Sequence, residues 1–144
     1  MLIETLPQLF DQTITAKEQD DQQATYAPNI KRDQEMLDWT RTAQELYNQV
    51  RGLHPWPVAS TTIEGKNLKV WWAERGQAVS TEASHAGEIV EITYDSINVA
   101  CGDGDFLKLT DIQLAGNKRM LVRDFLNGNP DLFKVGQRLG LTNE

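Results

Sequence analysis

The sequence predicts a mainly β domain with flanking helices, in which five or six short strands form a small closed barrel or a sandwich. Three observations predict this fold class. The length of 144 residues suits one domain. Short apolar runs separated by turn residues fill the region from 58 to 114, and helical patterns lie only before and after it. An apolar share of 40% and four tryptophans supply a core.

The first ten residues have apolar positions at spacings of three and four, which predicts a short amphipathic helix. Its apolar stripe comprises Leu2, Ile3, Leu6, Leu9 and Phe10. Residues 11–24 are rich in Gln, Asp, Glu and Thr and show no hydrophobic period, so we expect a linker there. The folded domain is expected to begin at Thr25 and to include residue 144.

A second helix is predicted to begin at Thr42, because Glu45 follows at the spacing of a capping box. Its apolar face consists of Ala43, Leu46, Tyr47 and Val50. Gly52 is expected to close the helix in a left-handed conformation. The prolines at 55 and 57 then prevent its continuation.

The strands are expected in the following order. A first hairpin joins 58–64 to 68–74 around Gly65-Lys66-Asn67, a second joins 88–93 to 97–101, and a fifth strand covers 106–114. A last helix is expected from 121 to 126. Its inward side would carry Leu121, Val122, Phe125 and Leu126.

Trp71 and Trp72 are adjacent, so on a regular strand they would point to opposite faces, one in the core and one exposed. An exposed indole beside Lys69 and Arg75 could stack on a nucleic-acid base or could cover another domain, and both alternatives remain open.

The sequence contains no arrangement of side chains typical of an active site or a metal site. His54 and His85 are far apart and lack further ligands at a helical spacing, so we interpret His54 as a turn residue. Asp103 and Asp105 alternate with glycines but lack the later glutamate of a calcium loop, which favours a turn. Cys101 is expected to be a small core residue. We therefore predict no catalytic residue, no metal ligand and no cofactor site in this chain.

The charge distribution gives a mixed signal for nucleic-acid binding. A net charge of -7 argues against non-specific binding to a polyanion. The region 112–138, however, has five Lys or Arg residues against two Asp. Lys118, Arg119 and Arg123 form the best basic cluster, which is either a phosphate contact or an ordinary solvated face.

No apolar run reaches the roughly 20 residues that span a bilayer, and the N-terminus lacks the pattern of a signal peptide. We expect a cytoplasmic protein without membrane contact.

Several short strings, in order, resemble the C-terminal domain of methionyl-tRNA formyltransferases. They are TYAP at 25–28, LDW at 37–39, VRGLHPWP at 50–57, LKVW at 68–71, VACGDG at 99–104, QLAGNK at 113–118 and DFLNG at 124–128. The resemblance implies that the strands form an OB-like β-barrel. It also implies that residues 1–24 are the last helix of a catalytic domain followed by its linker, and that 25–144 is the C-terminal domain.

The same resemblance implies a function. Enzymes of this family transfer a formyl group from 10-formyltetrahydrofolate to initiator methionyl-tRNA, with an Asn, a His and an Asp of an N-terminal domain. Their His-x-Ser-Leu-Leu-Pro motif is absent here, so we expect the chain alone to be inactive. Its expected partners are initiator methionyl-tRNA and the N-terminal catalytic domain.

Six basic residues are the candidates for binding the tRNA phosphates, and no catalytic residue is proposed among them. They are Arg51, Lys66, Lys69, Lys118, Arg119 and Arg123. Two alternatives stay open. The domain could be a structural module that only packs on the catalytic domain, and the parent could be a related formyltransferase acting on an amino sugar or a 10-formyltetrahydrofolate hydrolase.

Overall fold

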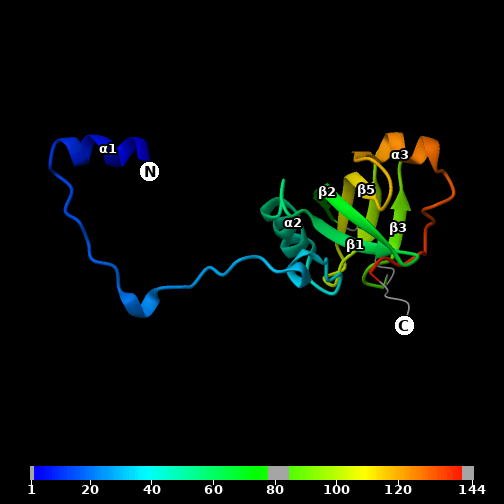
Figure 1. The fold of residues 1–144 in the computed structure, drawn as a ribbon, viewed down its shortest axis with the longest axis horizontal. Helices are drawn as coiled ribbons and strands as arrows, with labels where there is room; N and C mark the ends of the chain where they lie inside the picture. Colours follow the sequence, from blue (N-terminus) through cyan, green and yellow to red (C-terminus); the bar gives the residue numbers. More distant parts are fainter. Residues whose placement is uncertain (1, 78–84, 141–144) are drawn as a thin grey trace.

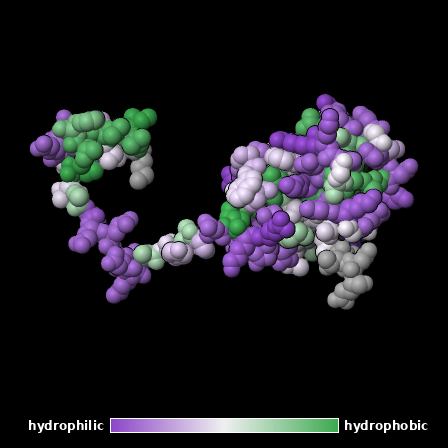
Figure 2. All heavy atoms as spheres, viewed as in Figure 1, coloured by the Kyte–Doolittle hydropathy of each residue, from purple (hydrophilic) through white to green (hydrophobic). Residues whose placement is uncertain are grey.

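The computed structural model describes residues 2–77 and 85–140. Helix α1 (Leu2–Phe10) lies apart from the rest, joined by a long extended stretch that contains the short 3-10 helix η1 (Asp21–Gln23) (Figure 1). The predicted first helix therefore forms, but none of its residues is buried. Figure 2 shows hydrophobic side chains gathered on α1, whereas the visible surface of the domain is mainly hydrophilic.

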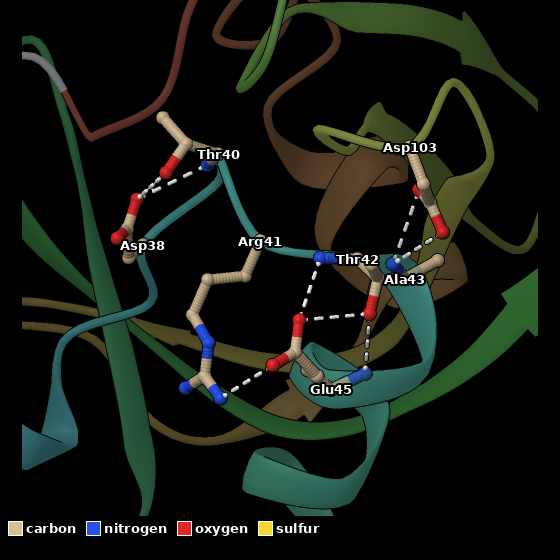
Figure 3. Close-up of polar contacts among 7 residues, drawn as sticks. All are labelled: Asp38, Thr40, Arg41, Thr42, Ala43, Glu45 and Asp103. Atoms are coloured by element: carbon tan, nitrogen blue, oxygen red, sulfur yellow. Dashed lines mark hydrogen bonds and ion pairs between the residues drawn. The ribbon is translucent and has the colours of Figure 1, made fainter.

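A second 3-10 helix, η2 (Arg32–Glu35), leads into α2 (Ala43–Gly52), which begins after Thr42 as predicted. The Thr42 hydroxyl accepts a hydrogen bond from the Glu45 backbone N–H at 3.2 Å, and Glu45 accepts one from the Thr42 N–H at 3.1 Å. Asp103, from the turn between two later strands, accepts from the Ala43 N–H at 3.1 Å (Figure 3). The start of α2 is thus fixed by its own capping box and by a distant carboxylate.

The prediction that Gly52 ends α2 in a left-handed conformation is wrong. Its φ is not among the positive ones, and Leu53 follows in a right-handed conformation with φ -91°. The Leu53 N–H donates to the Gln49 carbonyl oxygen at 3.0 Å. This hydrogen bond closes the last turn, so no left-handed residue is needed.

Six antiparallel strands form one sheet, which confirms the predicted sheet with flanking helices within a mixed fold. The strands are β1 (Ala59–Ile63), β2 (Lys66–Gly76), β3 (Ile89–Ile92), β4 (Ile97–Ala100), β5 (Phe106–Leu114) and β6 (Met120–Leu121). Their order is β1-β2-β5-β4-β3, with β6 paired to β5. Helix α3 (Val122–Gly128) follows β6, and α2 packs against β2 and β5. The core is the space that these elements enclose, where the side chains of Leu46, Val70 and Phe125 are buried.

The first hairpin is tighter than the sequence suggested. Ile63 pairs with Lys66, so only Glu64 and Gly65 form the turn. Both have positive φ, 49° and 75°, which is the conformation of the two-residue turn that matches the twist of the strands. Lys66 consequently belongs to β2 rather than to the loop.

The strands do not close into a hydrogen-bonded barrel, which corrects the predicted closed form. Over residues 2–77 and 85–140, no ladder joins β1 to β3. The tail lies between these edges instead: the Gly136 N–H donates to Ile89 O at 2.8 Å and the Gly140 N–H to Thr62 O at 2.9 Å. Since the tail satisfies the backbone groups of both edges, the edge strands need not pair with each other.

Candidate functional site

The outer face of β2 and β5 is shaped by two opposite β-bulges. Val70 pairs with Ile112, Trp72 with Asp111, and Ala73 with Leu109. Trp71 is therefore an extra residue on β2, and Thr110 is an extra residue on β5 one step further. The two insertions cancel, and the pairing resumes in its original register from Ala73 onward.

The bulges place both tryptophans on the outside, so the prediction of opposite faces is wrong. Val70 and Ala73 are buried on either side of the pair. Trp71 is half-buried and Trp72 is 37% exposed. Regular alternation, on which the prediction depended, is interrupted at these two residues.

His54 packs beside both indoles. Its ring centroid lies 5.5 Å from that of Trp72 and 6.2 Å from that of Trp71, in edge-on geometry. His54 lies in the turn after α2, as predicted. The three rings form an aromatic patch that connects this turn to the middle of β2.

Arg119 covers the indole of Trp71. Its guanidinium lies 4.4 Å from the Trp71 ring centroid, and its Nη2 and Nε donate to Asp111 Oδ2 at 2.6 and 2.9 Å. This hydrogen bonding raises the pKa of Arg119. The Trp71 Nε1 donates to Gln113 Oε1 at 3.1 Å, and Gln113 Nε2 donates to the Asn117 carbonyl oxygen at 3.1 Å. Arg119 is thus packed on a ring and paired with a carboxylate. The sequence did not reveal this pair, because the fold brings Asp111 of β5 beside the turn that holds Arg119.

Five of the six predicted basic residues lie on or beside β2 and β5. Lys69 pairs with Gln113 across the two strands. Lys66 adjoins Asn67, whose carbonyl oxygen accepts from the Ala115 N–H at 2.8 Å, so the first hairpin lies next to the turn that holds Lys118. We call Lys66, Lys69, Lys118, Arg119 and Arg123 the basic face; Lys66 lies at the hairpin end of β2, opposite the buried Ile63, and so on the other side of the strand from Lys69.

The lysines of the basic face differ from its arginines in their partners. Within the described part of the chain, Lys66, Lys69 and Lys118 form no ion pair or side-chain hydrogen bond. Arg123 meets Asp124 at 3.3 Å, with both side chains more than half exposed. Unpaired ammonium groups are free to meet an anion, so the three lysines are the most available charges.

Arg51 does not join the basic face. It lies on α2, where its guanidinium stacks over Tyr47 at 4.8 Å and its Nη2 donates to Asn48 Oδ1 at 2.8 Å. Both contacts are within its own helix.

A small hollow lies where the second hairpin meets β6 and α3. It has a volume of about 220 Å³. Its lining consists of Tyr94, Asp95, Thr110, Leu121 and Arg123. The sequence did not predict it, because an exposed tyrosine in a turn follows no pattern and its neighbours come from three separate elements.

Other features of the described residues carry no chemistry that we can assign. No group of three His, Cys, Asp or Glu among residues 2–77 and 85–140 could hold a metal ion. Burial raises the pKa of the Cys101 thiol to about 12, so it is a buried thiol and not a thiolate. No helix in these ranges has the length and apolar character needed to cross a membrane.

The chain matches a protein family and several named relatives. The family model described as formyl transferase, C-terminal domain, matches residues 29–130. The methionyl-tRNA formyltransferases of Bacillus licheniformis and Bacillus subtilis are 49% and 47% identical to it over 144 residues. These matches cover 100% of this chain and 44% of each relative, so the chain spans less than half the length of these relatives.

Solved structures with a similar fold include HypX from Aquifex aeolicus. One variant of it superimposes with a TM-score of 0.61 at 14% identity, covering 93% of this chain and 23% of HypX. Its complex with tetrahydrofolic acid gives a TM-score of 0.59 at 14% identity, covering 99% and 26%. At this identity the likeness concerns the fold alone.

Proposed function

The chain belongs to the family of formyl transferase C-terminal domains, and from that premise we propose that it is the tRNA-binding domain of a methionyl-tRNA formyltransferase. The proposed parent enzyme transfers a formyl group from 10-formyltetrahydrofolate to initiator methionyl-tRNA in the cytoplasm. Identities of 49% and 47% to two such enzymes support this assignment.

We propose the same organisation for the chain as for those relatives. Residues 1–24 would be the last helix of the catalytic domain and its linker, and 25–144 the C-terminal domain. The exposed apolar side of α1 supports a packing partner in the catalytic domain. The tail that connects both sheet edges supports an OB-like barrel that is completed by an irregular segment.

The formyl donor is proposed to bind outside this chain. The absence of a His-x-Ser-Leu-Leu-Pro string from the sequence supports this proposal. This chain alone is then inactive, and its contribution is to bind the substrate.

The observation that carries the proposed RNA contact is the group of unpaired lysines beside the aromatic patch. Lys66, Lys69 and Lys118 have no ionic partner in the described residues, and they adjoin a face where His54 and two tryptophans are exposed to some degree. Lysines neutralise phosphates, and aromatic rings stack on unpaired bases. The net charge of -7 disfavours non-specific binding of a polyanion to the rest of the surface.

The test is the salt dependence of binding to purified initiator tRNA. The triple variant K66E/K69E/K118E should bind more weakly, and the slope of log affinity against log salt should fall by about one for each phosphate contact removed. The matched control is K134E, which reverses an exposed lysine outside the basic face. A wild-type affinity that does not change with salt would contradict the proposal.

The alternative is that the domain only packs on the catalytic domain. One observation favours it, the 37% exposure of Trp72. If this indole covers the catalytic domain, the same triple variant placed in the whole enzyme would leave tRNA affinity unchanged. A parent acting on an amino sugar, or hydrolysing 10-formyltetrahydrofolate, predicts the same outcome.

A further inference from the structure

We propose that the hollow at Tyr94 holds one unpaired nucleotide of the RNA that the basic face binds. The inference rests on the proposed function and deepens it, because it assigns a site for a single base next to the phosphate contacts. Its residues come from the turn between β3 and β4, from β5, from β6 and from α3.

Two large apolar side chains line the hollow and are open to solvent. Tyr94 is 77% exposed and Leu121 is 46% exposed. The Tyr94 ring gives a planar base a surface to stack on, and the Leu121 side chain can contact the edge of that base. Unpaired RNA bases are commonly bound by stacking on such rings.

The charges of the hollow give the nucleotide an orientation. Arg123 meets only Asp124, at 3.3 Å and in solvent, and a weak exposed pair of this kind leaves its other donors free for a phosphate. Asp95 lines the same hollow, and its Oδ1 accepts from the Thr93 hydroxyl at 2.8 Å. A carboxylate repels phosphate and accepts from amino groups of bases. The phosphate is therefore placed at Arg123, with a base that carries an exocyclic amino group toward Asp95.

The hollow adjoins the basic face, because Arg123 belongs to both and strand pairing links Leu121 to the partner of Arg119. Leu121 pairs with Asp111, the residue that binds Arg119. The Thr110 hydroxyl donates to the Trp72 carbonyl oxygen at 3.5 Å. An RNA strand that contacts Lys118 and Arg119 therefore reaches Tyr94 through its next residues.

The experiment compares Tyr94 and Arg123 variants of the full chain in binding to purified initiator tRNA. Loss of one stacked base should weaken Y94A binding by about 5-fold or more, while the salt slope stays unchanged. The Y94F variant should bind like wild type, because the ring remains. R123A should weaken binding and lower the salt slope by about one.

Two further variants serve as controls. W56A removes another exposed aromatic ring, which lies beside Pro28 and Ile30, outside the hollow, and should not change affinity. Y94L keeps apolar bulk without a ring face, and it should match Y94A even if Y94A folds less well.

Each outcome decides the inference. Wild-type affinity in both Y94A and Y94L would overturn it while leaving the proposed function intact. No binding by the wild-type chain would overturn both. If tRNA affinity is unchanged but Y94A no longer binds the separately produced N-terminal half of the enzyme, the hollow belongs to a protein contact and the inference is wrong.

Discussion

Arg119 is committed to an ion pair inside the domain. The side chain of its partner Asp111 is only 12% exposed, whereas that of Arg119 is 46% exposed and lies over the Trp71 ring. Cation–π stacking and hydrogen bonding to one carboxylate oxygen fix the guanidinium and, with it, the turn that presents Lys118. Arg119 therefore positions the basic face more than it supplies free charge.

Replacing Arg119 tests this role. R119A leaves the mostly buried Asp111 carboxylate without its partner, so the free energy of unfolding should fall by about 1–2 kcal/mol, a value reduced for the exposure of the arginine. Urea unfolding measures it. K118A, next to it in sequence but unpaired among the described residues, should change stability by less than about 0.5 kcal/mol. Equal effects of the two variants would contradict the assignment.

At the scale of elements, the start of α2 depends on ionised carboxylates. The Glu45 carboxylate accepts from the Thr42 backbone N–H and from Arg41, and these bonds lower its pKa below 4.5 (Figure 3). The Thr40 hydroxyl and backbone N–H lower the pKa of Asp38 in the same segment. Both carboxylates therefore favour the folded state only while they are charged.

This leads to a prediction for acid stability. The pKa of Glu45 in the folded state lies below its ordinary value of 4.5. The stability that the Glu45 carboxylate gives the fold is therefore present above pH 4.5 and is lost as the pH falls through the folded pKa. The unfolding temperature of the wild type should therefore fall more steeply with acid than that of E45Q. Circular dichroism melts between about pH 3 and 7 measure both curves. Parallel curves would show that the cap does not couple to protonation.

Elements governed by local chemistry were partly predictable from the sequence, and those governed by distant contacts were not. The capping box of Thr42 and Glu45 is encoded within four residues and was predicted as observed, whereas the turn at Gly65 was predicted in place but too long. The bulge at Trp71 depends on how β5 pairs, which alternation along one strand cannot show. The tail likewise has no strand pattern, although its Leu139 is buried in the core.

The same division holds for the candidate site. Its lysines were predicted from charge and from the resemblance, and their role in binding stays a prediction. The Asp111–Arg119 pair and the hollow at Tyr94 were missed, because each is assembled from residues that only the fold brings together.

At the scale of the whole molecule, the folded domain is independent of the N-terminal helix. Helix α1 has no buried residue and lies away from the sheet (Figure 1). The family match ends at residue 130, yet the core extends further, since Phe133 packs against Phe125 with ring centroids 5.7 Å apart. The stable unit therefore includes the tail and excludes α1.

Deletion of residues 1–24 tests this division. Because the removed part buries nothing in the domain, the unfolding temperature should stay within about 2 °C of that of the full chain. Differential scanning calorimetry measures it. A larger decrease would mean that α1 packs on the domain in solution.

Each bulge adds one residue to a stretch bounded by buried residues, Val70 and Ala73 on β2 and Leu109 and Ile112 on β5. Removing Trp71 alone or Thr110 alone would restore regular alternation in that strand, with Ala73 and Ile112 still facing the core. The outer face of this sheet can therefore gain or lose a residue during evolution while the pattern of the core side stays the same.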